Sequence, residues 1–226
     1  MSQPNPTIYT AIPTLKGLKQ AYPGVKSLFF DMDGTLFDTE RFHTQAFLKI
    51  GKDHQVIPPG SLASVHQLLV GKADHLVFEV VKSWQGFPQH WSARDFVDIK
   101  TQNLLELLKE IPSRDFFHHE LESLLKEAKA QGLFLALVTS SEKIITSQLL
   151  ALTGLDKIFD LVLTRDDCEK HKPDPWPYLK ALEISGSAPK QTIIFEDSQV
   201  GIAAALAAET HVVQVGWHPE FDISKV

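Results

Sequence analysis

Runs of mainly apolar residues mark the strands that this chain is expected to form. They lie at residues 28–30, 133–138, 158–164, 192–195 and 212–215. The first two runs show no apolar–polar alternation, which is typical of strands buried on both faces, as in a parallel sheet. Between the later runs, apolar residues recur at the three- and four-residue spacing of helices. Strands that alternate with helices predict an α/β fold, a parallel sheet with helices on its faces.

A longer helical stretch separates the first strand from the second. From about residue 40 to residue 112, apolar side chains recur at helical spacing without a strand-like run. We therefore expect an all-helical cap domain at 40–112, inserted into a core formed by 27–39 and 113–226. Residues 1–26 hold four prolines and no acidic residue, and we expect an N-terminal arm there, packed on the core or partly disordered.

Composition and net charge limit the classes of molecule that this protein is expected to bind. The 226 residues carry a formal net charge of −6, which disfavours nucleic acid and anionic membranes as partners. No apolar run approaches the ~20 residues that span a bilayer, so we expect no membrane partner and a cytoplasmic location. The single cysteine, Cys168, excludes an intrachain disulfide and is compatible with a reducing compartment. The sequence leaves the oligomeric state open.

Two aspartates, Asp31 and Asp33, directly follow the first apolar run and flank Met32 before Gly34. Open α/β sheets bind their ligands at the carboxyl ends of strands, where these carboxylates are expected. Residues two apart on a strand point to the same face, so the pair would repel at a cost of roughly 4 kcal/mol. A nearby cation or a bound proton removes that cost. One aspartate could then attack as a nucleophile while the other transfers protons, or both could simply belong to an acidic turn.

Further polar residues follow the later strands. Thr139 follows the second run, Glu196 and Asp197 follow the fourth, and Lys172 lies in a loop between them. A parallel sheet brings these positions to one edge, beside Asp31. Such an acidic cluster requires a hard cation, and Mg²⁺ prefers oxygen ligands. A lysine cannot bind that metal, but it can neutralise an aspartate and hold a phosphate. Taken singly, these residues could equally be helix caps or surface charges.

Four segments together resemble the motifs of the haloacid dehalogenase-like hydrolases, in the order of that family. They are Asp31–Thr39, Val138–Ser141, Lys172–Pro175 and Phe195–Gly201. The resemblance covers nearly everything after residue 27. It implies a Rossmann-like core with an inserted helical cap, Mg²⁺ as cofactor, and a small phosphorylated metabolite as substrate.

The resemblance also implies a role for each motif residue. Asp31 would attack phosphorus and form an aspartyl phosphate, while Asp33 would protonate the leaving oxygen and later take a proton from water. Thr139, Ser140 and Lys172 would bind the phosphoryl group, and Lys172 would also pair with Asp31. The implied metal ligands are Asp31, Asp33 through its main-chain carbonyl, Asp197 and, directly or through water, Glu196.

Within the family, phosphoglycolate-type phosphatases tend to have Gly-Asp in the fourth motif and a second Asp four positions on. Here Glu196–Asp197 followed by Gly201 instead resembles the branch of beta-phosphoglucomutase and of sugar- and polyol-phosphate phosphatases. His43 matches a histidine on the first cap helix of that branch, and Lys72 lies in a segment like its substrate-facing loop. We expect both to contact the substrate, although each could be a surface residue. Asp74 stands near the position of the mutase's phosphate-binding arginine, which argues against a mutase.

These features predict a Mg²⁺-dependent phosphatase acting on a small phosphate monoester of the sugar, polyol or glycolate phosphate class. Two alternatives remain. A phosphosugar mutase would share the same site, and a receiver-like phospho-switch would also use an acid pocket, Mg²⁺, a hydroxyl and a lysine on a parallel sheet. The inserted helices and the second acid, Asp33, argue against the switch, which needs neither.

Overall fold

The computed structural model describes residues 6–61, 64–65 and 74–218, and these form two compact units. The described residues of Thr39–Pro112 form the helical unit. The described residues up to Asp38 and from Ser113 onward form the sheet unit. None of the helices in the described ranges is long and apolar enough to cross a membrane.

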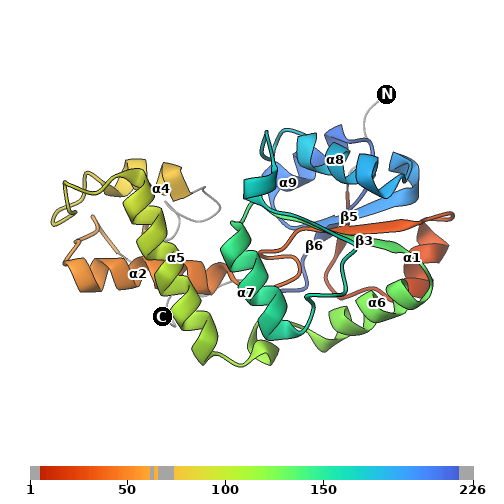
Figure 1. Ribbon diagram of the computed structural model, residues 1–226, viewed down its shortest axis with the longest axis horizontal. Helices are drawn as coiled ribbons and strands as arrows, with labels where there is room; N and C mark the ends of the chain where they lie inside the picture. The colour runs from red at the N-terminus through yellow and green to blue at the C-terminus, as the bar shows by residue number, and fades with distance from the viewer. Residues whose placement is uncertain (1–5, 62–63, 66–73, 219–226) are drawn as a thin grey trace. The chain divides into compact units, whose positions relative to one another are not determined.

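Parallel strands form one sheet in the sheet unit, in the order β1-β6-β5-β2-β3-β4 (Figure 1). The strands are β1 (Thr7–Tyr9), β2 (Ser27–Phe30), β3 (Phe134–Val138), β4 (Leu161–Leu163), β5 (Thr192–Glu196) and β6 (His211–Val215). The non-consecutive neighbours show that the chain crosses over through helices, as parallel pairing requires. The predicted α/β fold with a parallel sheet is therefore confirmed.

Helices cover both faces of this sheet. They are α1 (Leu15–Ala21), α6 (His119–Ala130), α7 (Lys143–Thr153), α8 (Trp176–Ser185) and α9 (Gln199–Ala207), with single 3₁₀ turns at Ser113–Asp115, Arg165–Asp167 and Pro189–Gln191. In Figure 1, α8 and α9 lie on one face, and α1, α6 and α7 lie on the other. Both faces of the central strands are thus removed from water, which explains their uninterrupted apolar sequence.

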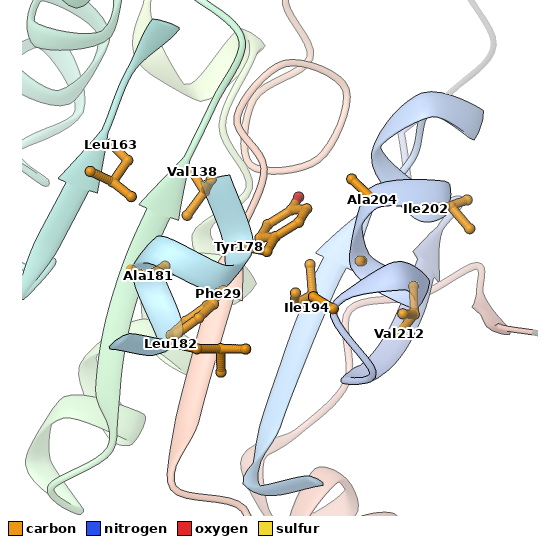
Figure 2. Close-up of a cluster of buried hydrophobic side chains, with 13 residues drawn as sticks. Phe29, Val138, Leu163, Tyr178, Ala181, Leu182, Ile194, Ile202, Ala204 and Val212 are labelled. Carbon is orange, nitrogen blue, oxygen red and sulfur yellow. The ribbon is translucent and has the colours of Figure 1, made fainter. Parts of the chain in front are cut away.

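The central strand β2 places the first motif. All four of its residues are buried, and Phe30 pairs in register with Phe195 on β5 and with Leu137 on β3. Beneath α8 and α9, the apolar cluster of Figure 2 includes Phe29, Ile194 and the fully buried Tyr178. Because three neighbouring strands are aligned residue by residue, the polar residues that follow them emerge at the same edge of the sheet.

The N-terminal segment contributes more to the sheet than its sequence indicates. The segment forms the short helix α1, which Thr14 caps by accepting a hydrogen bond from the Gly17 amide. In addition, β1 pairs with β6 and extends the sheet by one edge strand. This strand has only three residues, and Ile8 is 63% exposed, so it lacks the buried apolar run that marked the others.

The helical unit is inserted between β2 and β3, as the sequence predicted for a cap. It contains α2 (Glu40–His54), α4 (Asp74–Val81) and α5 (Ala93–Glu110). An aromatic-rich cluster holds these helices together, and Phe47, Trp84 and Phe96 are among its buried members. Ser92 and Asp95 form a reciprocal capping box that defines where α5 begins.

Candidate functional site

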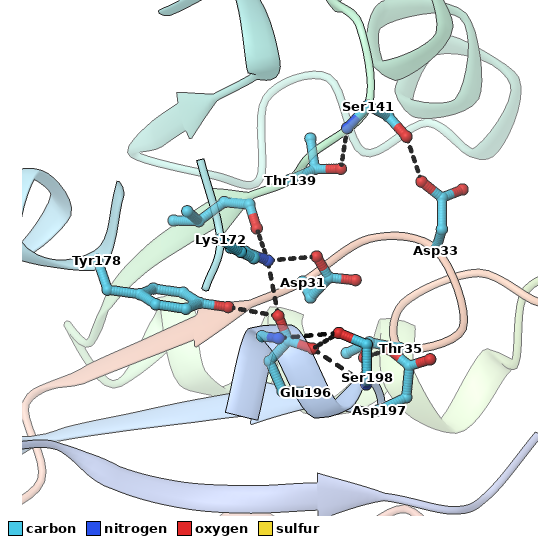
Figure 3. A network of polar contacts seen from close by, with 12 residues as sticks. Asp31, Asp33, Thr35, Thr139, Ser141, Lys172, Tyr178, Glu196, Asp197 and Ser198 are labelled. Atoms are coloured by element: carbon cyan, nitrogen blue, oxygen red, sulfur yellow. Dashed lines mark hydrogen bonds and ion pairs between the residues drawn. The ribbon is translucent and has the colours of Figure 1, made fainter. Parts of the chain in front are cut away.

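The end of β2 positions Asp31 between two neighbouring strands. Its amide donates to the carbonyl of Phe195 at 3.0 Å, so the hydrogen-bond ladder continues through Asp31 itself. The amide of Thr139 is held in the same way by the Leu163 carbonyl at 2.9 Å. Both side chains therefore leave the sheet edge from backbone that is fixed by strand pairing (Figure 3).

Lys172 reaches this edge from the loop before α8, and three acceptors surround its ammonium group. Nζ lies 2.6 Å from Asp31 Oδ1, 2.7 Å from Glu196 Oε1 and 2.9 Å from the Val138 carbonyl (Figure 3). These contacts match the three donors of an ammonium, and the side chain is only 3% exposed. Although burial acts to lower the pKa of Lys172, Asp31 and Glu196 raise it well above its usual value, so the lysine stays charged.

Glu196, the last residue of β5, is fully buried, and both of its oxygens accept hydrogen bonds. Oε1 accepts from Lys172 and from the Tyr178 hydroxyl at 2.8 Å. Oε2 accepts from the amide of Ser198 at 3.3 Å and from its hydroxyl at 3.0 Å. A carboxylate offers about four acceptor sites. Glu196 is therefore already saturated, and its clearest function in this geometry is to hold Lys172 in place.

Two glycines make room for the acidic side chains. A Cβ on Gly201 would lie within 1.8–2.2 Å of the Glu196 carboxyl group, and a Cβ on Gly34 would lie 2.3 Å from Asp197 Oδ2. Gly34 also has φ +78°, which L-residues with a side chain rarely adopt. The glycines of the first and fourth motifs are thus required by close approach to the carboxylates.

Asp197 completes a group of carboxylates that can hold a metal ion. One oxygen from each of Asp31, Glu196 and Asp197 lies within 4.8 Å of the other two. Asp31 and Asp197 would be the direct ligands, whereas Glu196, whose oxygens already accept hydrogen bonds, would act through water. Burial raises the pKa of Asp31, Lys172 opposes that shift, and the two neighbouring acids add to it. A divalent cation would relieve this repulsion, and oxygen donors of this kind suit Mg²⁺. The donor chemistry therefore fits a hard divalent cation.

The loop of the first motif is fixed by side chains from distant parts of the chain. Thr35 donates from Oγ1 to Asp197 Oδ1 at 2.9 Å. Its carbonyl accepts from Trp217 Nε1 at 3.0 Å and from His218 Nε2 at 2.9 Å. Residues beyond β6 thereby hold the loop that follows the two aspartates.

The second motif places a hydroxyl beside the second aspartate. The Ser141 hydroxyl donates to Asp33 Oδ2, and the Ser141 amide donates to Thr139 Oγ1 at 3.0 Å (Figure 3). Thr139 is buried, whereas Ser140 is exposed. All the motif residues that the sequence assigned to chemistry therefore lie in the sheet unit, and Lys172 and the carboxylates of Asp31, Glu196 and Asp197 form one contiguous cluster there.

In the helical unit, the predicted His43 belongs to a cluster with Lys100 and Asp74. Lys100 on α5 donates to Asp74 on α4, and its Nζ lies 3.3 Å from Nδ1 of His43 on α2. Because an ammonium can only donate, Nδ1 of the histidine accepts. The expectation that His43 contacts the substrate remains a prediction. Lys72 lies outside the described residues.

Sequence reasoning missed two residues that contact the motif side chains. Tyr178 lies on the buried face of α8, where its sequence context is that of an ordinary core aromatic, and Lys172 Nζ lies 4.9 Å from its ring centroid. Ser141 directly follows the residues assigned to phosphate binding, but its contact with Asp33 joins residues 108 apart in the chain. No local pattern could have identified either contact.

Comparisons with known proteins find relatives of similar sequence and solved structures of similar fold. Fructose-1-phosphate phosphatase YqaB from Escherichia coli K12 is 29% identical over 198 residues, which cover 86% of this chain and 98% of that protein. Pyrophosphatase PpaX from Bacillus mycoides is 27% identical over 201 residues, covering 85% and 84%. The structure of CbbY from Rhodobacter sphaeroides in complex with phosphate has a TM-score of 0.75 at 25% identity, covering 88% and 91%.

The family match extends over most of the chain. The family described as haloacid dehalogenase-like hydrolase matches residues 28–215, which include all four motifs and cover most of the described residues of both compact units. The resemblance stated from the motifs is therefore confirmed. This chain belongs to the haloacid dehalogenase-like hydrolase family and is an enzyme of that family.

Proposed function

We propose that this enzyme is a Mg²⁺-dependent phosphatase that hydrolyses a small phosphate monoester through an aspartyl phosphate on Asp31. The observation that carries this proposal is the contact of 2.6 Å between Lys172 and Asp31 within a cluster of buried carboxylates. The ammonium opposes protonation of Asp31 and adds positive charge where phosphoryl oxygens would bind. A purely structural ion pair would not require two further carboxylates at the same edge.

The two aspartates divide the reaction into two displacements. An oxygen of Asp31 forms a bond to phosphorus while the bond from phosphorus to the leaving oxygen breaks, and Asp33 gives its proton to that oxygen. Asp33 then takes a proton from water, which attacks phosphorus and breaks the bond to Asp31. Inorganic phosphate leaves, and both carboxyl groups return to their initial protonation states.

Mg²⁺ would be held by Asp31, by the main-chain carbonyl of Asp33 and by Asp197. When bound, it would neutralise charge on the phosphoryl oxygens. The hydrogen bonds that already saturate Glu196 favour an indirect role for this residue, through water, over direct ligation. Its direct task is to hold Lys172 against Asp31.

The proposed substrate class is sugar, polyol or glycolate phosphates. It is supported by the relative named fructose-1-phosphate phosphatase. The relative named pyrophosphatase adds inorganic pyrophosphate to the compounds that need testing. The substrate panel should therefore contain sugar, polyol and glycolate phosphates together with pyrophosphate.

Phosphate release from this panel, measured with and without Mg²⁺, tests the proposal. We expect turnover of at least one monoester that EDTA abolishes and added Mg²⁺ restores. Asp31→Asn should abolish release while far-UV circular dichroism stays unchanged. Asp156→Asn, an exposed surface aspartate, serves as the matched control and should keep full activity. Near-wild-type turnover by Asp31→Asn would contradict the proposal.

Two further measurements, of isomer formation and of labelling at Asp31, separate the alternatives. Conversion of a hexose 1-phosphate into its isomer in the presence of the hexose bisphosphate, without phosphate release, would indicate a mutase. Long-lived labelling of Asp31 without phosphate release would indicate a phospho-switch. The pairing of Asp74 with Lys100 disfavours the mutase, because an acid stands near the position where the mutase has a phosphate-binding arginine.

A further inference from the structure

Ser141 lies in the loop between β3 and α7, and each of its polar groups makes a contact within the sheet unit. Its amide donates to Thr139 Oγ1 at 3.0 Å, and its carbonyl accepts from the Arg165 amide at 2.9 Å. Its hydroxyl donates to Oδ2 of Asp33 (Figure 3). Hydrogen bonds of both its amide and its carbonyl therefore fix the main chain of Ser141, and its side chain points at Asp33.

The position of the Ser141 hydroxyl is determined by the sheet. Val138 is the last residue of β3, and the following amide, that of Thr139, continues the ladder to Leu163. A serine has a single side-chain torsion before its oxygen, with three staggered choices. Once the main chain is fixed, only one torsion remains to be set, so the hydroxyl can hold a partner at a small cost in conformational entropy.

We propose that Ser141 is a positioning residue for Asp33 in the proposed phosphatase reaction, on which this inference rests. Its hydroxyl donates to Oδ2 whether Asp33 is charged or neutral, so the transferable proton is carried by Oδ1. The proton moves from Oδ1 to the leaving oxygen in the first displacement and from water to Oδ1 in the second. Ser141 itself gains and loses no proton.

This role makes a prediction that a purely structural role would not make. Proton donation matters most when the leaving group is a poor one, such as the alkoxide of a polyol or sugar. It matters little for p-nitrophenolate, which leaves without a proton. Loss of the Ser141 hydroxyl should therefore slow the hydrolysis of an alkyl phosphate more than that of p-nitrophenyl phosphate, because kcat/KM reports the first displacement.

The test compares kcat/KM for p-nitrophenyl phosphate with that for the alkyl phosphate that the wild type hydrolyses best. For Ser141→Ala we expect a loss of about tenfold on the alkyl ester and less than about threefold on the aryl ester. Ser141→Thr keeps the hydroxyl and should restore most of the alkyl activity. Ser123→Ala removes an exposed hydroxyl from α6, where it donates to the His119 carbonyl, and should change neither rate.

A double variant addresses the pairing directly. In an Asp33→Asn background, adding Ser141→Ala should cause no further loss on the alkyl ester, since both changes remove the same function. Equal losses on both esters, or additive losses in the double variant, would overturn this inference while leaving the phosphatase intact. A wild type that releases no phosphate from any ester would instead overturn the proposed function, and this inference with it. A thermal melt of each variant identifies any loss that is due to misfolding.

Discussion

Each unit of this enzyme buries one lysine beside a carboxylate, and the two clusters differ in their balance of charge. In the sheet unit, Lys172 contacts Asp31 and Glu196, and Asp197 completes the acidic group. Three carboxylates are thus grouped at one ammonium, which contacts two of them. In the helical unit, Lys100 contacts one carboxylate, that of Asp74, and a histidine nitrogen that accepts a hydrogen bond. Among the described residues of the two clusters, the first carries the larger excess of negative charge, and such an excess calls for a further cation.

The two clusters also differ in what positions their side chains. Asp31 and Glu196 are neighbours because β2 and β5 are hydrogen-bonded in register through Phe30 and Phe195. In the helical unit, the members come from three separate helices, whose spacing depends on apolar packing. Hydrogen bonds between paired strands fix the positions of two residues relative to each other, because the strand register determines which residues lie opposite. Side-chain packing between helices constrains these positions less tightly. We therefore expect substitutions in the first cluster to cause large losses, and substitutions in the second cluster to cause smaller ones.

The largest expected effect is that of Lys172→Met. It leaves Asp31 and Glu196 buried without their ammonium, and we expect phosphate release to fall by at least about 10³-fold. Loss of one partner from a buried pair also costs about 3–5 kcal/mol of stability. Lys126→Met, which removes an exposed lysine paired with Glu122, is the control. Release assays and denaturant unfolding measure both effects, and substantial activity in Lys172→Met would refute the role assigned to the cluster.

Gly201→Ala should be the next most damaging change. Its new Cβ would fall within 1.8–2.2 Å of the Glu196 carboxyl group, which the surrounding hydrogen bonds hold in place. We expect a loss of about 2 kcal/mol of stability together with reduced activity. Gly51→Ala in α2 of the helical unit is the matched control, since its Cβ would be 3.4 Å from the nearest atom outside its own turn. Equal stabilities of the two variants in urea unfolding would show that Glu196 can move aside.

In the helical unit, Lys100→Met should cost less. The Lys100 and Asp74 side chains are 10% and 21% exposed. Water can therefore partly solvate the Asp74 carboxylate once Lys100 is replaced. We expect a loss of about 1–3 kcal/mol. In the double variant Lys100→Met/Asp74→Asn, which leaves no unpaired charge, part of this loss should be recovered. Thermal melts of the single and double variants provide the measurement, and a double variant less stable than Lys100→Met would contradict the charge-balance argument.

The smallest effect is expected at a surface pair of the sheet unit. Asp160 accepts from Lys129 at 2.5 Å and from the Leu135 amide at 3.0 Å. Although partial burial acts to raise the pKa of Asp160, these donors hold it below its usual value. Its stabilisation is therefore present above the unfolded-state pKa of ~3.9 and is lost as pH falls through the lower folded-state pKa.

Asp160→Asn should accordingly lower stability by about 1 kcal/mol at pH 7. The difference from the wild type should shrink steadily below about pH 4. Urea unfolding at several pH values measures this. Asp98→Asn, which removes an exposed carboxylate 3.8 Å from Arg94, is the control and should change little at any pH. A difference for Asp160→Asn that does not depend on pH would contradict the assigned cause.

Much of the sheet and most of the motif positions could be predicted because each rests on a local pattern. Apolar runs reveal buried strands, and the polar residues that end them, such as Asp31, Thr139 and Glu196, identify the ligand-binding edge. The edge strand β1 could not be predicted in this way, because a three-residue strand that is largely exposed does not require an apolar run. The contacts of Tyr178 with Glu196 and of Ser141 with Asp33 could not be predicted either, because the partners in each pair are distant in sequence.

By itself, the amino-acid sequence determined the class of this protein: an α/β sheet with a helical insertion, and an acidic edge with one lysine. Both follow from the order of apolar runs and the residues at their ends, which is one-dimensional information. Only the tertiary structure decided which oxygens Lys172 contacts, that Glu196 is saturated, and that Ser141 faces Asp33. Those outcomes depend on ångström-scale distances between segments, which strand register and close packing set after the chain has folded.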